Sequence, residues 1–249
     1  MPLYVPKNLP AIKELSAQGI KLYSEIRQKY KNTPQEHMDT FYRNFDELAS
    51  ERYEGMIVTG APVERIPFED VRYWKQLTEI FDWSRTEIGS AVYLCWGAQV
   101  GLYHHYGVPK YDLPKKLFGV YRQELMKQNL PIFRNIPHVF NMPHSRYTEV
   151  RKSDIDQVED LEIFAQGESS GVGIVKPKNR SEFFVMGHLE YSPTTLDTEY
   201  RRDLGRGLDI DMPENYYTDN DPEKGPDYSW QKPADAFYSN WLNYYVNKK

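Results

Sequence analysis

Apolar residues fall in short runs that end at turn residues, and these runs alternate with stretches whose apolar positions have helical spacing. Residues 56–58 form one run, which stops at Thr-Gly-Ala-Pro (59–62), and residues 91–94 form another. Both are typical of strands buried in a parallel sheet. Helices are predicted over residues 68–83 and 97–106. The order strand, helix, strand, helix indicates β-α-β units.

The rest of the pattern adds further strands and helices. Three apolar runs are close enough to pair as a meander, at residues 161–165, 171–176 and 182–186. Helices are predicted at 194–206 and 236–246, and a Thr-Pro-Gln-Glu capping box at 33–36 begins another that reaches Leu48. Residues 19–24 alternate weakly, as a short strand does, and the polar, proline-containing middle of the chain carries no predicted element. Together these elements predict a three-layer α/β fold, with a mostly parallel sheet and antiparallel additions.

The composition is that of an ordinary globular protein. The 249 residues are 40% hydrophobic and 27% charged, and we expect a single domain over residues 1–249 because no repeat or linker divides them. A net charge of −5 without a basic stripe argues against nucleic acid as a partner. Residues 91–103, the longest mostly apolar stretch, fall short of the roughly 18 residues of a membrane span. Because the N-terminus also lacks a signal-peptide pattern, we expect a cytoplasmic protein with no membrane partner.

The single cysteine, Cys95, excludes an internal disulfide and a Cys-rich zinc site. It stands between the predicted strand at 91–94 and the helix at 97–106, as the nucleophile of a strand-turn-helix elbow does. There the thiol faces the amides of a helix N-terminus, which favour a thiolate, and the amide of Trp96 is placed to donate to a developing oxyanion. The alternative is a small buried core residue.

A candidate base lies at the end of another predicted strand. His188 follows the strand at 182–186, and Glu190 is two residues further on, where a carboxylate can orient an imidazole. Strands of an open α/β sheet deliver their last residues to one edge, so Cys95 and His188 are expected to meet. The alternative is a capped strand end with a surface histidine.

Other polar residues give weaker signals. Residues 143–147, Pro-His-Ser-Arg-Tyr, are expected in a loop and offer a hydroxyl and a guanidinium to a substrate. Arg201 and Arg202 are either a solvated helix face or a carboxylate-binding pair. The histidines at 104–105 and the acidic run at 219–223 fit surface features, because adjacent histidines on a helix point in different directions, and we expect no metal site.

Six segments together carry a family resemblance. They are Thr-Gly-Ala-Pro (59–62), Cys-Trp-Gly-Ala-Gln (95–99), Pro-His-Ser-Arg (143–146), Gly-His-Leu-Glu-Tyr (187–191), Pro-Glu-Asn-Tyr (213–216) and Asn-Trp-Leu-Asn-Tyr-Tyr (240–245). In order and spacing, from Thr33 to Val246, the chain resembles the homoserine O-acyltransferase family of methionine biosynthesis, of the homoserine transsuccinylase type. The resemblance implies a class I glutamine amidotransferase-like α/β fold and an acyl-cysteine mechanism.

The resemblance also implies roles for individual residues. Cys95 matches the nucleophile, His188 the base and Glu190 its partner, in agreement with the residues themselves. The family's substrate-binding positions are matched by Lys116, Ser145 and Arg202. Glu64 falls on the position that sorts the acyl donor, where Glu resembles the acetyl-using members. A carboxylate there would repel the free carboxylate of a succinyl group and not a methyl group.

The chain departs from the family pattern near its N-terminus. Between about Arg27 and Asn32 the family has a longer segment with the first buried strand and a lysine thought to assist the site, so residues 1–32 are a shortened N-terminal segment. Unpaired buried backbone groups cost about 1–3 kcal/mol each. We therefore expect residues 19–25 to fill part of the vacant place beside the strands at 56–59 and 91–94, and the alternatives are pairing with another subunit or marginal stability. Milder departures are Leu189 for a common Pro and Ser192 for a common Asp.

The main hypothesis is a homoserine O-acetyltransferase that moves an acetyl group from acetyl-CoA to the hydroxyl of L-homoserine through acetyl-Cys95. Acetyl-CoA is a substrate, and no other cofactor is expected. The alternatives are the same chemistry on serine or with succinyl-CoA, a non-catalytic relative that lost turnover with the missing strand, and a glutaminase or cysteine hydrolase. The only macromolecular partner that we consider is a second copy of this chain, in a homodimer.

Overall fold

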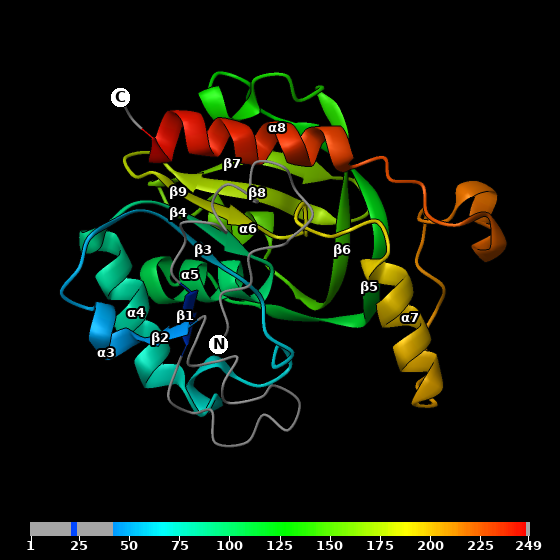
Figure 1. Cartoon of the computed structure of the whole chain (residues 1–249), viewed down its shortest axis with the longest axis horizontal. Coiled ribbons are helices and arrows are strands. Elements are labelled where there is room, and N and C mark those ends of the chain that lie inside the picture. The colour runs from blue at the N-terminus through cyan, green and yellow to red at the C-terminus, as the bar shows by residue number, and fades with distance from the viewer. Residues whose placement is uncertain (1–20, 24–41, 248–249) are drawn as a thin grey trace.

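A seven-stranded sheet organises the computed structural model, which describes residues 21–23 and 42–247 (Figure 1). The strand order is β3-β4-β9-β8-β7-β5-β6. β3, β4 and β9 run parallel, and the other neighbours pair antiparallel. The strands are β3 (Tyr53–Val58), β4 (Ile88–Leu94), β5 (Tyr111–Leu125), β6 (Val139–Glu149), β7 (Leu161–Gly167), β8 (Gly171–Pro177) and β9 (Glu182–Val185).

Helices cover both faces of the sheet. α8 (Gln231–Trp241), continued by a π-helical turn at Leu242–Val246, packs on one face, and α4 (Trp74–Glu87) and α5 (Trp96–Tyr106) pack on the other (Figure 1). Alternate residues of β4 therefore enter different cores: Val92 joins the core under α8, and Tyr93 joins the core under α4 and α5. This sandwich of helix, sheet and helix is the predicted three-layer α/β arrangement.

Shorter elements connect these layers. The remaining elements are β1 (Lys21–Tyr23), β2 (Tyr42–Asn44), α3 (Phe45–Leu48), α6 (Lys152–Ile155), α7 (Thr195–Gly205) and 3-10 turns at Phe68–Asp70, Pro131–Phe133, Thr218–Asn220 and Pro222–Lys224. Among the described residues, no helix is both long enough and apolar enough to span a membrane.

The apolar runs predicted as strands are confirmed in β3, β4, β7, β8 and β9, and the helices at 97–106 and 194–206 are confirmed as α5 and α7. The final helix begins at Gln231, five residues before its predicted start. The helix predicted at 68–83 is divided, because Val71 has an extended backbone with φ −70° and ψ 122° that ends a 3-10 turn, and α4 begins only at Trp74.

The middle of the chain was predicted wrongly. It contains β5 and β6, which pair along almost their whole length, and residues 143–147 belong to β6 and not to a loop. Alternate positions of both strands face the outside of the core, so the strands carry many polar residues and lack the continuous apolar run of a buried strand.

The N-terminal prediction is also wrong where the structure describes it. β3 pairs directly with β4, with Ile57 opposite Val92, and β1 pairs with β2 in a separate two-stranded sheet. β3 is an edge strand within the described sheet, so only one of its sides needs a partner strand there. In the helix predicted from the capping box, residues 42–44 form β2 and only Phe45–Leu48 is helical, whereas residues 33–41 lie outside the described part of the chain.

Candidate active site

Cys95 occupies a strained turn between β4 and α5. It is the N-cap residue of α5, with φ 49° and ψ −119°, a backbone conformation that non-glycine residues rarely adopt. Its amide donates to the carbonyl oxygen of Val185 on β9 at 2.8 Å. Two residues later, a Cβ at Gly97 would lie 2.9 Å from the carbonyl oxygen of Thr59, so only glycine lets the helix start this close to the end of β3. The geometry is that of a nucleophile elbow.

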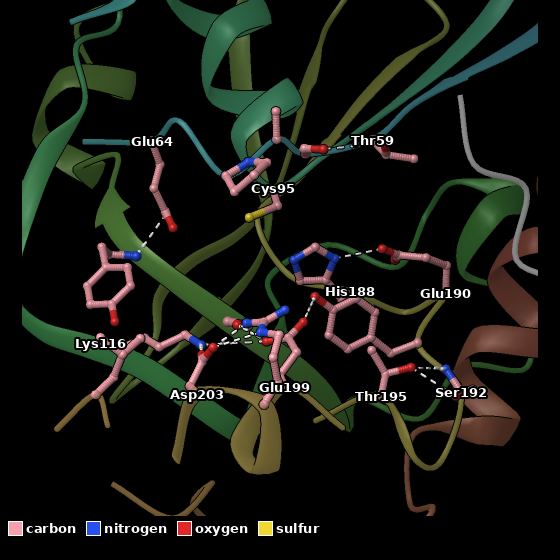
Figure 2. Close-up of a pocket in the computed structure, with 18 residues that line it drawn as sticks. Thr59, Glu64, Cys95, Lys116, His188, Glu190, Ser192, Thr195, Glu199 and Asp203 are labelled. Atoms are coloured by element: carbon pink, nitrogen blue, oxygen red, sulfur yellow. Dashed lines mark hydrogen bonds and ion pairs between the residues drawn. The ribbon is translucent and has the colours of Figure 1, made fainter. Parts of the chain in front are cut away.

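His188 reaches the same sheet edge from β9. Leu94 at the end of β4 pairs with Val185 at the end of β9, so the parallel strands bring the two following segments together. Nδ1 of His188 lies 2.6 Å from Oε1 of Glu190, and His188 and Cys95 line the same cavity. Figure 2 shows His188 between Cys95 and Glu190. The expected meeting of Cys95 and His188 is therefore present in the structure.

The surroundings of His188 favour its charged form. Burial alone lowers the pKa of this histidine, but the charges of Glu190 and Cys95 and the hydrogen bonds to both raise it, so the net pKa lies well above its ordinary value. The ring of Tyr191 stacks on the imidazole with centroids 4.1 Å apart, and the His188 amide donates to Pro143 O at 2.8 Å. Ring and backbone are thus both fixed.

These groups open into a cavity of about 650 Å³. All the side chains that the sequence analysis assigned to catalysis, substrate binding or donor choice line it: Glu64, Cys95, Lys116, Ser145, His188, Glu190 and Arg202. They come from segments far apart in the sequence (Figure 2). The amide of Trp96, the first residue of α5, has no carbonyl four residues earlier in the helix to bond, as at every helix start.

The wall formed by α7 and the neighbouring strands β5 and β6 is densely charged. Oε2 of Glu199 accepts from the Ser145 hydroxyl at 2.6 Å and lies 3.5 Å from Nζ of Lys116. Lys116 also lies 3.6 Å from Asp203, which accepts two hydrogen bonds from Arg202 at 2.7 and 3.0 Å. Mixed charges of this kind suit a zwitterionic amino acid, which carries one ammonium and one carboxylate group.

Glu199 and Asp203 were missed in the sequence analysis. Both look like solvated helix positions, yet Thr195, Glu199 and Asp203 follow one another at intervals of four and therefore share one face of α7, which lines the cavity. That spacing was the available signal. Arg201, by contrast, pairs with Asp197 at 2.9 Å on the exposed side of the helix and does not line the cavity.

Glu64 lies in the loop after β3, and its Oε2 accepts from the Tyr147 amide of β6 at 2.8 Å. Burial raises the pKa of Glu64, while the Tyr147 amide and the charges of Lys116, His188 and Arg146 partly oppose the rise. Glu64 and Glu190 lie on opposite sides of Cys95 in Figure 2. Glu64 is thus a partly buried cavity residue and not a freely solvated loop carboxylate.

Two expectations about polar clusters need correction. On β6 only Ser145 and Tyr147 line the cavity, whereas Arg146 points to the other face of the strand and is buried, so its guanidinium is not offered to a substrate. The histidine pair is not simply a surface feature, because the side chain of His105 is only 4% exposed. Within the described residues, Asp82, His104 and His105 bring their ligand atoms within 4.8 Å of one another, and His104 Nε2 lies 2.7 Å from Asp82.

Comparison with protein families gives a match over most of the chain. The family model described as homoserine O-succinyltransferase matches residues 19–249. A homoserine O-acetyltransferase of Bacteroides fragilis is 52% identical over 239 residues, which cover 96% of this chain and 77% of the relative. The corresponding values are 53%, 96% and 76% for a homoserine O-acetyltransferase of Parabacteroides distasonis, and 50% over 216 residues, 87% and 71% for one of Brevibacillus brevis.

Solved structures resemble the fold. A glutamine amidotransferase from Thermotoga maritima has a TM-score of 0.59 at 14% identity and covers 83% of this chain and 87% of its own. A glutamine amido transferase from Methylobacillus flagellatus has a TM-score of 0.57 at 11% identity, with 86% and 88% covered. At these identities the likeness concerns the fold alone, and it confirms the predicted glutamine amidotransferase-like α/β architecture.

Proposed function

The chain belongs to the homoserine O-succinyltransferase family, a family of O-acyltransferases, and we propose that it transfers an acetyl group from acetyl-CoA to the γ-hydroxyl of L-homoserine. Relatives that are 50–53% identical and described as homoserine O-acetyltransferases support this choice of donor and acceptor. The structural observation that carries the proposal is the hydrogen-bonded pair of His188 and Glu190 in one cavity with Cys95 and Glu64. The product belongs to amino-acid biosynthesis.

In the first half of the reaction, Cys95 is the nucleophile. Its proton is held by His188, and the thiolate attacks the carbonyl carbon of acetyl-CoA. The new bond joins that carbon to the Cys95 sulfur, the bond from carbon to the CoA sulfur breaks, and His188 returns the proton to the departing CoA thiolate. The amide of Trp96 donates to the carbonyl oxygen while it carries negative charge.

In the second half, homoserine takes the place of CoA. His188 accepts the proton of the γ-hydroxyl, whose oxygen attacks the acetyl carbon, and the bond from that carbon to the Cys95 sulfur breaks. Glu190 holds the imidazole in the required orientation and stabilises its positive charge. The thiolate and imidazolium are then restored together, ready for another acetyl-CoA.

The cavity wall offers groups for the amino acid acceptor. We assign the homoserine carboxylate to Lys116 and Arg202, and the Ser145 hydroxyl to a position beside the substrate. Both cations already face carboxylates, Glu199 and Asp203, so a bound carboxylate joins an existing network. We also assign the acyl group of the donor to the part of the cavity beside Glu64, whose carboxylate would disfavour a succinyl group.

The test is an acyl-transfer assay with homoserine and serine as acceptors and with acetyl-CoA and succinyl-CoA as donors. Intact mass after mixing with acetyl-CoA alone reports the acetyl adduct on Cys95, and the Cys95→Ser variant is the control for the modified residue. Preferred transfer from acetyl-CoA to homoserine, together with the adduct, supports the proposal.

Other outcomes identify the alternatives. If transfer to serine is faster than transfer to homoserine, serine is the acceptor; if transfer from succinyl-CoA is faster, succinyl-CoA is the donor. In both cases the acyl-cysteine chemistry is retained. An unmodified Cys95 with no transfer to either acceptor would indicate a non-catalytic relative. Ammonia release from glutamine without acyl transfer would indicate a glutaminase.

A further inference from the structure

α4 and α5 pack closely against each other on the same face of the sheet (Figure 1). A Cβ at Gly101 of α5 would lie 3.1 Å from Cε1 of Phe81 of α4, so a residue without a side chain allows this close approach. His105 follows Gly101 by four residues and shares its helix face, and its ring lies 5.9 Å from that of Phe81 between centroids. The packing thus brings Asp82, the next residue of α4, to the last turn of α5.

Three potential metal ligands meet at this contact. Nε2 of His104 lies 2.7 Å from Oδ1 of Asp82, and Nδ1 of His105 lies 4.0 Å from the same oxygen. The ligand atoms of all three side chains lie within 4.8 Å of one another. The sequence argued against a metal site because adjacent histidines on a helix diverge. Here, however, the two rings approach to 4.7 Å between centroids, and Asp82 joins them from the other helix.

His105 is not explained by the packing of the core alone. Its side chain is only 4% exposed, and its Nε2 is buried without a hydrogen-bond partner among the described residues. Burial and, to a smaller extent, the charge of Arg85 lower the pKa of His105 to about 3. The imidazole is therefore neutral, and one of its nitrogens carries a lone pair that can bind a metal ion. A buried polar ring that completes no hydrogen-bond network requires another explanation, such as a bound ion.

The donor set and its spacing fit a divalent transition-metal ion. Imidazole nitrogens and carboxylate oxygens are common ligands of zinc, which binds them at about 2.0–2.2 Å in a tetrahedral arrangement. Ligand atoms of such a site lie about 3.3–3.5 Å apart, so the pair at 2.7 Å would widen and the pair at 4.0 Å would narrow, each by less than about 1 Å. The side chain of Asp82 is 66% exposed, which lets its carboxylate turn and leaves room for water as the fourth ligand.

The surroundings of the three ligands suit an ion that does not take part in acyl transfer. Arg85, which lies one turn beyond Asp82 on α4, pairs with Glu182 at 3.1 Å, so its positive charge is already compensated. His104 is nine positions after Cys95, about 14 Å along the axis of α5. None of the three ligands lines the cavity that contains Cys95. An ion bound here would join two helices at the end opposite to the nucleophile.

We propose that Asp82, His104 and His105 bind one divalent transition-metal ion, for which zinc is the best fit, and that this ion fastens the last turn of α5 to α4. The site is independent of the proposed acyltransferase activity. The three ligands come from two helices and meet only in the folded chain. A bound ion therefore favours the folded state and raises the melting temperature.

The experiment titrates Zn²⁺ into the full chain, without an affinity tag, and follows calorimetric binding and thermal unfolding. All the proteins carry Cys95→Ser, which removes the thiol as a competing zinc ligand. Asp82→Asn and His104→Gln each delete one ligand at a position that solvent reaches. The matched control is His138→Gln, because His138 also pairs with a carboxylate, that of Glu124 at 3.0 Å. Within the described residues His138 belongs to no three-ligand cluster.

We expect one Zn²⁺ per chain, and a melting temperature that rises by several degrees when free zinc exceeds the dissociation constant about a hundredfold. Asp82→Asn and His104→Gln should each weaken binding by about tenfold or more, since even the loss of an outer-shell partner costs about 10–100-fold. His138→Gln should bind zinc and be stabilised by it as the Cys95→Ser parent is.

The results that would overturn the proposal are specific. One is a Cys95→Ser parent that binds no zinc, and another is a dissociation constant that stays the same in Asp82→Asn and His104→Gln. Equal weakening in His138→Gln would also overturn it, because zinc would then respond to histidine–carboxylate pairs in general. The melting temperature of each variant without zinc shows whether it is folded. Acyl transfer is measured separately with Cys95 in place, so the two proposals can fail independently.

Discussion

Gly60 lies directly against Cys95: a Cβ at Gly60 would be 3.4 Å from Cβ and 3.8 Å from Sγ of the cysteine, and 3.5 Å from the amide nitrogen of Trp96. These are ordinary van der Waals distances, so a methyl group fits the folded protein. It would, however, occupy the space beside both the nucleophile and the proposed oxyanion donor. We therefore expect the space left by the absent side chain at residue 60 to receive the substrate carbonyl.

Gly60→Ala should separate activity from stability. We expect a melting temperature close to that of the wild type, and acetylation of Cys95 slowed by about 10²–10³, the usual cost of a lost oxyanion contact. Gly205→Ala on α7 is the matched control, because a Cβ there meets nothing within 4 Å. Single-turnover mass spectrometry with acetyl-CoA measures both variants, and an unimpaired Gly60→Ala would place the oxyanion elsewhere.

Glu64 should decide between acyl donors without affecting the nucleophile. Replacing Glu64 with Gly removes a negative charge from the acyl end of the cavity, and such an interaction in a partly wet pocket is worth about 1–3 kcal/mol. The ratio of kcat/KM for succinyl-CoA to that for acetyl-CoA should rise by about ten to a hundredfold, while Cys95 still acylates. Glu64→Gln, which keeps the shape and the acceptor for the Tyr147 amide, should reproduce part of the change. An unaltered ratio in both variants would remove Glu64 from donor choice.

The same residue predicts a pH dependence of donor choice. Because burial raises the pKa of Glu64, its carboxyl group takes up a proton at a higher pH than an ordinary glutamate does. As pH falls through that raised value, Glu64 loses its charge and the repulsion of succinate weakens. Relative use of succinyl-CoA should therefore increase toward acidic pH in the wild type and stay nearly constant in Glu64→Gln. Competition assays with both donors across the acidic range provide the measurement.

The sequence was sufficient to predict those elements that have a simple local pattern, such as a continuous apolar run. Residues 91–94 are continuously apolar because β4 is buried on both faces, and this also placed Cys95 at the end of a strand. β5 and β6 have no such signature, since each has an exposed or cavity-facing side. Whether Tyr42 belongs to a helix or a strand depends on its pairing with residue 21, which a local pattern does not contain.

In the candidate site, the sequence predicted the residues whose positions follow from the strand order, and it missed those whose roles depend on side-chain direction or on packing between elements. Cys95 and His188 were predictable because parallel strands end at a common edge. The direction of the Arg146 side chain was not predictable. Successive residues of a strand point to opposite faces of the sheet, and β6 itself had not been predicted. The role of Glu199 and Asp203 as cavity residues becomes visible only in the folded chain, where α7 brings both carboxylates next to Lys116.

Glu190→Gln tests how the base is kept charged. Glu190 is one of the groups that raise the pKa of His188, so removing its charge should lower that pKa and reduce the imidazolium population in the resting enzyme. We expect kcat to fall by about 10²–10⁴, as when a general base loses its orienting partner. Alkylation of Cys95 should also slow at neutral pH and recover as pH rises. A kcat within twofold of the wild type would contradict the role assigned to Glu190.

The adjacent arginines of α7 provide the last prediction with its own control. Arg202 lines the cavity and pairs there with Asp203, whereas Arg201 pairs with Asp197 on the exposed side of the same helix. A hydrogen bond to a charged group contributes about 1.5–3 kcal/mol, so Arg202→Ala should lower kcat/KM for homoserine by about ten to a hundredfold. The loss should appear mainly in KM for homoserine, because in the proposed complex the arginine binds the acceptor's carboxylate and not the reacting atoms. The first half of the reaction, followed as acetylation of Cys95, should be unchanged.

Arg201→Ala is the control, because it removes the same charge one residue away. We expect both measurements to stay near their wild-type values in this variant. Equal effects of the two variants would mean that activity responds to the charge of the helix in general and that Arg202 does not hold the substrate.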